Sequence, residues 1–121
     1  MKHRDWFLAG DGQCKPCETV NEWKLLRENY RLYRFLTELE DTLKDSIDEA
    51  NCLPKIRLLV RQFITNSYWL QTQEPEPCEQ TGTSVTLLYD ELGFPLTVQT
   101  VKFMPGVIST IHNHGTWGVI A

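Results

Sequence analysis

The spacing of apolar residues changes near the middle of the chain, and this change limits the fold more than any other feature. Between residues 19 and 70 apolar side chains recur every three or four positions, which is typical of amphipathic helices. From residue 84 onward they alternate with polar ones, which is typical of strands. A stretch with prolines and a glycine, QTQEPEPCEQTGT (71–83), separates the two patterns. The sequence therefore predicts an α+β fold, with helices followed by antiparallel strands.

Two helices are predicted in the helical region 19–72. The first begins with Thr19 as N-cap and Glu22 three residues later, which together form a capping box. The second covers residues 55–70, with Pro54 near its first turn, where a missing N–H costs little. A short connection between the helices predicts an antiparallel pair. The predicted apolar face of the first helix consists of Val20, Trp23, Leu26, Tyr30, Tyr33, Leu36, Leu39, Leu43 and Ile47.

The strand pattern predicts the first part of a β domain over residues 83–121. The runs SVTLLYD (84–90) and PLTVQTVKF (95–103) are rich in valine, threonine and leucine and predict a β-hairpin. The sequence MPG (104–106) predicts a turn, and VISTIHNHGTWGVIA (107–121) predicts one or two more strands. Within the second run, alternation places Leu96, Val98, Thr100 and Lys102 on one face and Thr97, Gln99, Val101 and Phe103 on the other.

Charge and hydropathy exclude two classes of partner. A net charge of −4 and a pI near 5.3 argue against nucleic-acid binding, which normally requires a clustered basic face. No apolar run approaches the roughly 20 residues that a membrane-spanning helix needs. The apolar patch Trp6–Ala9 is shorter than the core of a signal peptide, about 7–15 residues. These observations predict a cytoplasmic protein that binds neither nucleic acid nor membrane.

Four cysteines are present, but without a secretion signal they do not predict a disulfide framework. Cys14 and Cys17 form the motif CKPC within the N-terminal segment 1–18. This spacing suits half of a tetrahedral zinc site or a redox pair. No second such motif or nearby histidine completes a zinc site, and no strand pattern precedes the motif as in a thioredoxin unit. We therefore expect reduced thiols on a loop.

The most specific chemical signal is the pair His112 and His114. Residues two apart on a strand point to the same side, so both imidazoles can reach one metal ion. On a helix the same residues would lie about 200° apart, which prevents joint coordination. Imidazole suits iron, zinc, copper and nickel, so the pair alone does not select a metal. The alternative is that both histidines simply face solvent.

The segment PGVISTIHNHGTWGVIA (105–121) resembles the first metal-binding motif of the cupin superfamily: a glycine, five residues, and two histidines separated by one residue. Within that superfamily it is most similar to the cysteine dioxygenase-like (thiol dioxygenase) branch. A glutamate usually follows the second histidine in other cupins, but Gly118 and Val119 occupy those positions here. Thiol dioxygenases generally hold iron with three histidines and no carboxylate. The absence of a glutamate at Gly118 and Val119 therefore agrees with a resemblance to this branch.

The resemblance implies a jelly-roll barrel, Fe(II) bound by His112 and His114, and oxidation of a small thiol to a sulfinate by O2. Trp117 is then either a wall of the substrate pocket or a core residue. The arginine that holds the substrate carboxylate in cysteine dioxygenase would fall near Thr86, and the predicted hairpin contains no arginine. The thiol is therefore open between cysteine, 3-mercaptopropionate-type compounds and an N-terminal cysteine of a protein.

A cupin barrel has further strands after its first motif, one of which carries the third histidine. The only other histidine in this sequence is His3. The resemblance thus leads us to expect the N-terminal portion of a longer protein, catalytically inactive by itself. Two alternatives are a cupin that binds a metal or small molecule without turnover and a helical protein-interaction module.

Overall fold

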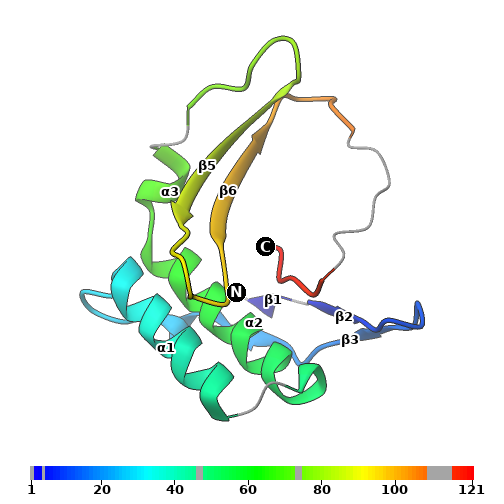
Figure 1. The fold of residues 1–121 in the computed structure, drawn as a ribbon, viewed down its shortest axis with the longest axis vertical. Helices are drawn as coiled ribbons and strands as arrows, with labels where there is room; N and C mark the ends of the chain where they lie inside the picture. Colours follow the sequence, from blue (N-terminus) through cyan, green and yellow to red (C-terminus); the bar gives the residue numbers. More distant parts are fainter. Residues whose placement is uncertain (1, 4, 46–47, 73–74, 109–115) are drawn as a thin grey trace. The chain divides into compact units, whose positions relative to one another are not determined.

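A computed structural model describes residues 2–3, 5–45, 48–72, 75–108 and 116–121. Three α-helices and three two-stranded antiparallel sheets lie within these residues, which confirms the predicted mixture of helices and antiparallel strands (Figure 1). One compact unit comprises residues 1–67 with 115–121, and a second comprises residues 68–114. The elements are β1 (Lys2–His3), β2 (Trp6–Leu8), β3 (Cys14–Pro16), β4 (Val20–Asn21), η1 (Glu22–Leu25), α1 (Leu32–Asp45), α2 (Glu49–Asn66), α3 (Trp69–Thr72), β5 (Thr83–Tyr89) and β6 (Val98–Phe103).

Two short antiparallel ladders organise the N-terminal residues of the first unit. β1 pairs with β4, and β2 pairs with β3, so that Leu8 lies opposite Cys14. Gly12 adopts φ +89° near the turn between β2 and β3, where Ala9 N donates to Gln13 O at 2.8 Å. The expectation that Cys14 lies on a loop is therefore wrong. These strands are only two or three residues long, too short to produce a readable alternation.

The first predicted helix starts later than its sequence pattern suggests. The residues predicted as its first turn instead form β4 and the 3-10 helix η1, and α1 begins at Leu32. The predicted capping box of Thr19 and Glu22 is wrong, because Asn21 caps η1 by accepting a hydrogen bond from Trp23 N at 3.1 Å. Asn29 adopts φ +56°, a left-handed conformation that interrupts any continuous helix.

A side chain from the far end of α2 stabilises this non-helical segment. Asn66 Nδ2 donates to Leu25 O at 2.9 Å, and Asn66 Oδ1 accepts from Arg27 N at 2.9 Å. Both backbone groups are thereby satisfied outside a helical hydrogen-bond ladder. A tertiary contact between residues about 40 positions apart in the chain thus overrides the local helical periodicity.

The α1 and α2 helices pack as an antiparallel pair, as predicted. Phe35 near the start of α1 stacks on Phe63 near the end of α2, with ring centroids 4.5 Å apart and planes 3° apart. Phe35 and Leu39 are buried, whereas Tyr33 is 65% exposed. The predicted apolar face is therefore wrong at Tyr33 and omits Phe35, because the contact with Phe63 determines which side of α1 is buried. Ile47, the last residue of the predicted face, lies outside the described residues.

The second helix begins earlier than predicted, at Glu49, and ends at Asn66. Asp48 is its N-cap residue, and the backbone oxygen of Asp48 accepts hydrogen bonds from Asn51 N and Cys52 N. Pro54 thus lies inside the helix and not in its first turn. The lost hydrogen bond is tolerable because Ala50, four residues earlier, is exposed and its carbonyl can be solvated. No described helix is both long and apolar enough to cross a membrane.

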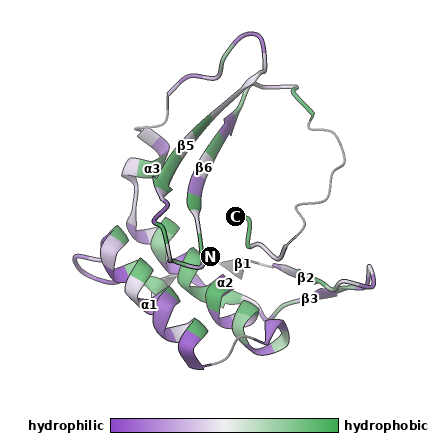
Figure 2. Cartoon of the chain, in the orientation of Figure 1, coloured by the Kyte–Doolittle hydropathy of each residue, from purple (hydrophilic) through white to green (hydrophobic). Residues whose placement is uncertain are grey.

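The predicted hairpin of the second unit is confirmed. β5 and β6 are antiparallel, with Thr83 opposite Phe103 and Val85 opposite Val101 (Figure 1). Hydrophilic and hydrophobic residues alternate along β6 (Figure 2). The exposure of its side chains follows the same period: Val98, Thr100 and Lys102 are half-buried, and Gln99, Val101 and Phe103 are exposed.

The turn after the hairpin is also confirmed, but the described end of the chain differs from the prediction. Gly106 adopts φ +83°, and Val107 N donates to Met104 O at 3.1 Å. Residues 116–121 form no strand. Gly118 has no side chain to pack there, and no described strand pairs with these residues. The remainder of the predicted strand, residues 109–115, lies outside the described residues.

Candidate functional site

The predicted metal ligands His112 and His114 lie outside the described residues, so their geometry stays a prediction. Within the part of the chain that the structure describes, no group of three or more histidine, cysteine, aspartate or glutamate side chains is arranged to hold a metal ion. Cys14 and Cys17 in particular belong to no such group. Both are free thiols, as are Cys52 and Cys78.

The backbone just before the histidine pair is held against the start of β5. Met104 N donates to Gly82 O at 2.8 Å, which closes the open end of the hairpin. Gly82 adopts φ +72°, and a Cβ atom added there would lie 2.7 Å from Cγ2 of Val107. Only glycine therefore allows this close approach. The backbone of Met104 and the side chain of Val107 therefore both lie against Gly82.

Trp117, the predicted pocket wall or core residue, belongs to the first unit and is half-buried. It lies in a segment without regular secondary structure. It does not line the cleft that lies between residues 18–25 and α2 in the first unit. The structure thus brings Trp117 to no candidate site, and its role in a substrate pocket stays a prediction.

An exposed cysteine, Cys78, occupies a tight turn before β5. Its backbone closes the turn, because Cys78 N donates to Thr83 O at 3.0 Å and Gly82 N donates to Cys78 O at 2.7 Å. Hydrogen bonds from the backbone of Gln80, and then from the backbone and side chain of Thr81, lower the pKa of the Cys78 thiol. The lowered pKa of this thiol could not be predicted from the sequence, since only the folded turn directs these donors toward it.

A charged cluster in the first unit was also missed. Arg57 Nη1 donates to Asp5 Oδ2 at 3.1 Å, and Arg61 Nε donates to the same oxygen at 3.1 Å. Arg61 Nη2 also pairs with Asp5 Oδ1. The three side chains are 14–23% exposed. The hydrogen bond from Arg61 is the largest cause of a lowered pKa at Asp5. The sequence feature that could have indicated this cluster is the spacing of Arg57 and Arg61, which lie four residues apart and so on the same side of α2.

Arg57 keeps donors that no described protein group accepts. Its hydrogen bonds, to Asp5 Oδ2 and to Glu18 O at 3.0 Å, both come from Nη1. Nε is buried and has no hydrogen-bond partner among the described residues. Arg57 therefore has hydrogen-bonding capacity beyond its contacts with Asp5 and Glu18.

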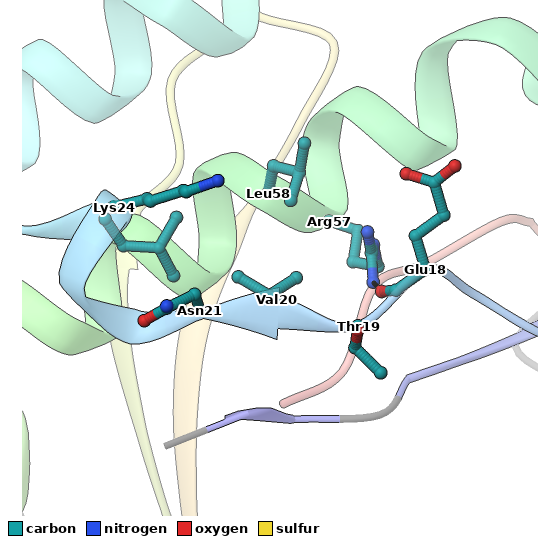
Figure 3. A pocket seen from close by; sticks show the side chains of 8 residues that line it. Glu18, Thr19, Val20, Asn21, Lys24, Arg57 and Leu58 are labelled. Atoms are coloured by element: carbon teal, nitrogen blue, oxygen red, sulfur yellow. Dashed lines mark hydrogen bonds between the residues drawn. The ribbon is translucent and has the colours of Figure 1, made fainter.

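A cleft of about 510 Å³ adjoins Arg57 in the first unit. The segment from Glu18 to Leu25 forms one side and α2 forms the other (Figure 3). Figure 3 shows the Lys24 side chain reaching toward Leu58, whereas the Glu18 carboxylate points away from Val20. The residues that line the cleft are Glu18, Thr19, Val20, Asn21, Lys24, Leu25, Arg57 and Leu58. Sequence reasoning could not assemble it, because its two sides lie more than thirty residues apart in the chain.

Comparison of the chain with protein-family models, with curated proteins and with solved structures found no match.

Proposed function

We propose that this chain carries the first metal-binding motif of a cytoplasmic, iron-dependent thiol dioxygenase of the cupin superfamily. The observation that carries the proposal is the pair His112 and His114, placed six residues after Gly106 in a β-patterned run. Two imidazoles at this spacing on a strand present their nitrogens to one ion. The first strands of a jelly-roll barrel are the fold that this proposal requires around the pair.

The order of elements before the motif supports the proposal. An antiparallel hairpin, β5–β6, precedes the histidines, and a glycine turn with Gly106 at φ +83° connects them to β6. The cupin resemblance places a hairpin and a glycine at these points. The donor set fits iron in its chemistry, since neutral imidazole is a suitable ligand for Fe(II).

The proposed reaction adds both atoms of O2 to the sulfur of a thiolate and yields a sulfinate. Bound Fe(II) would supply Lewis acidity toward the thiol and activation of O2. The protein's part is to hold the metal through His112 and His114 and to keep neutral ligands around it. A third neutral ligand completes the expected set, and the described residues do not identify it.

Thiol-dependent oxygen uptake by the iron-loaded full-length protein tests the proposal. We expect uptake with cysteine or 3-mercaptopropionate and formation of the matching sulfinate, detected by mass spectrometry. The double variant His112→Gln, His114→Gln should lose this uptake, and His3→Gln should retain it. Iron binding without uptake for any thiol would favour the alternative of a metal-binding cupin without turnover. Equal uptake by the double variant would refute the proposal.

A further inference from the structure

We propose that the cleft between the segment Glu18–Leu25 and α2 binds a small organic monoanion, a carboxylate with a short aliphatic chain. The proposal rests on the first unit alone and does not depend on the histidine pair. It therefore stands or falls separately from the proposed oxygenase activity.

The size and floor of the cleft suit a small amphiphilic molecule. Its volume of about 510 Å³ falls within the range of small-molecule sites, about 300–1,000 Å³. Val20 and Leu25 are buried, and Leu58 is 41% exposed. These three side chains form an apolar surface on which a short alkyl chain would be shielded from water.

The charge at the rim favours an anion. Arg57 Nη2 makes no hydrogen bond to the described residues, because both bonds of this guanidinium use Nη1. Lys24 forms no ion pair with any side chain that the structure describes. Among the side chains that the structure describes, Glu18 is the one acidic group that lines the cleft, and its carboxylate points away from Val20 (Figure 3). An acid group in the cleft would therefore meet two cationic side chains, Arg57 and Lys24, that both line it.

A carboxylate fits these donors better than a phosphate dianion. The Arg57 charge is partly balanced by Asp5, so Arg57 and Lys24 together offer less than two full positive charges. Phosphate sites usually add several backbone N–H groups, as at the start of a helix. Here α2 contributes Arg57 and Leu58 from its middle and not its N-terminus.

Titration with hexanoate, followed by amide chemical shifts in NMR spectra, tests the proposal. We expect saturable binding with a Kd below about 10 mM and shifts centred on Val20, Leu25 and Leu58. Acetate, which lacks the alkyl chain, and hexan-1-ol, which lacks the charge, should each bind at least about tenfold more weakly. Lys24→Met keeps the length of the side chain but removes its charge, and should weaken hexanoate binding by about tenfold.

Lys44→Met is the matched control, because Lys44 lies in α1, is well exposed and does not line the cleft. It removes the same charge and should leave the hexanoate affinity unchanged. The proposal is overturned by any of three results: no saturable shift at the cleft, equal affinity for hexanoate and hexan-1-ol, or equal affinity in Lys24→Met and Lys44→Met.

Discussion

At the scale of single residues, Asp5 connects the N-terminal ladder to α2. Its backbone oxygen accepts a hydrogen bond from Cys17 N at 2.7 Å, and its carboxylate pairs with Arg57 and Arg61. The carboxylate is 16% exposed, so water screens these pairs less than it screens a surface ion pair. Removing it would take away the carboxylate that lies between two nearby guanidinium groups.

Acid should therefore destabilise the first unit through Asp5. The folded-state pKa of Asp5 is lowered, chiefly by the hydrogen bond from Arg61, below the unfolded value of about 3.9. Its contribution to stability is fully present above that value and is lost as the pH falls through the folded-state pKa. In urea unfolding, Asp5→Asn should lower the free energy of unfolding at pH 7 by about 1–2 kcal/mol and flatten its decline below about pH 4.

Asp41→Asn provides the control for this measurement, because Asp41 is an exposed residue of α1. Its effect should stay within about 0.5 kcal/mol. An identical acid dependence of unfolding in wild type and Asp5→Asn would show that the charged cluster does not contribute.

The turn around Cys78 gives a second prediction for a single residue. Since donors from Gln80 and Thr81 lower the pKa of this thiol, it should react with iodoacetamide at a lower pH in the folded chain than in urea. Thr81→Val removes the hydroxyl donor but keeps the shape of the side chain, and should shift the midpoint of alkylation upward. Peptide mapping by mass spectrometry measures this midpoint. A midpoint unchanged by both urea and Thr81→Val would contradict the assignment.

At the scale of elements, local patterns predicted the hairpin better than the first helix. The strand β6 could be predicted because one of its faces is exposed, so apolar and polar residues alternate between neighbouring positions from Val98 to Phe103. The start of α1 was not readable, because Asn66 holds the backbone of Leu25 and Arg27 in a non-helical path. The helical spacing of apolar residues extends back to Val20, but the residues before Leu32 do not belong to α1 in the folded structure.

Two aromatic residues of α1 distinguish the predicted helix face from the observed one. Phe35 is 2% exposed and stacks on Phe63, so Phe35→Ala should lower the free energy of unfolding by about 3–5 kcal/mol. Tyr33 belongs to the apolar face predicted from the sequence but is 65% exposed. Tyr33→Ala should therefore lower the free energy of unfolding by no more than about 0.5 kcal/mol. Chemical unfolding monitored by circular dichroism compares the two. A larger effect at Tyr33 would contradict the observed register.

At the scale of the whole molecule, the two candidate sites differ in how far the sequence could predict them. The histidine pair is visible in the sequence because both histidines lie within three consecutive residues. The cleft is not, since the fold brings Lys24 and Arg57 together from separate elements. The mixture of helices and antiparallel strands was also predictable, because helical and strand periods occupy separate stretches after residue 19. The predicted order is wrong at the N-terminus, where the four short strands β1 to β4 precede the helices.

The central claim, that His112 and His114 share one metal ion, is tested most directly by anaerobic titration with Co(II). The visible absorption of bound cobalt reports its affinity for the protein. We expect His112→Gln and His114→Gln each to weaken binding by at least about tenfold, and His3→Gln to leave it unchanged. Unchanged Co(II) affinity in both His112→Gln and His114→Gln would contradict the account.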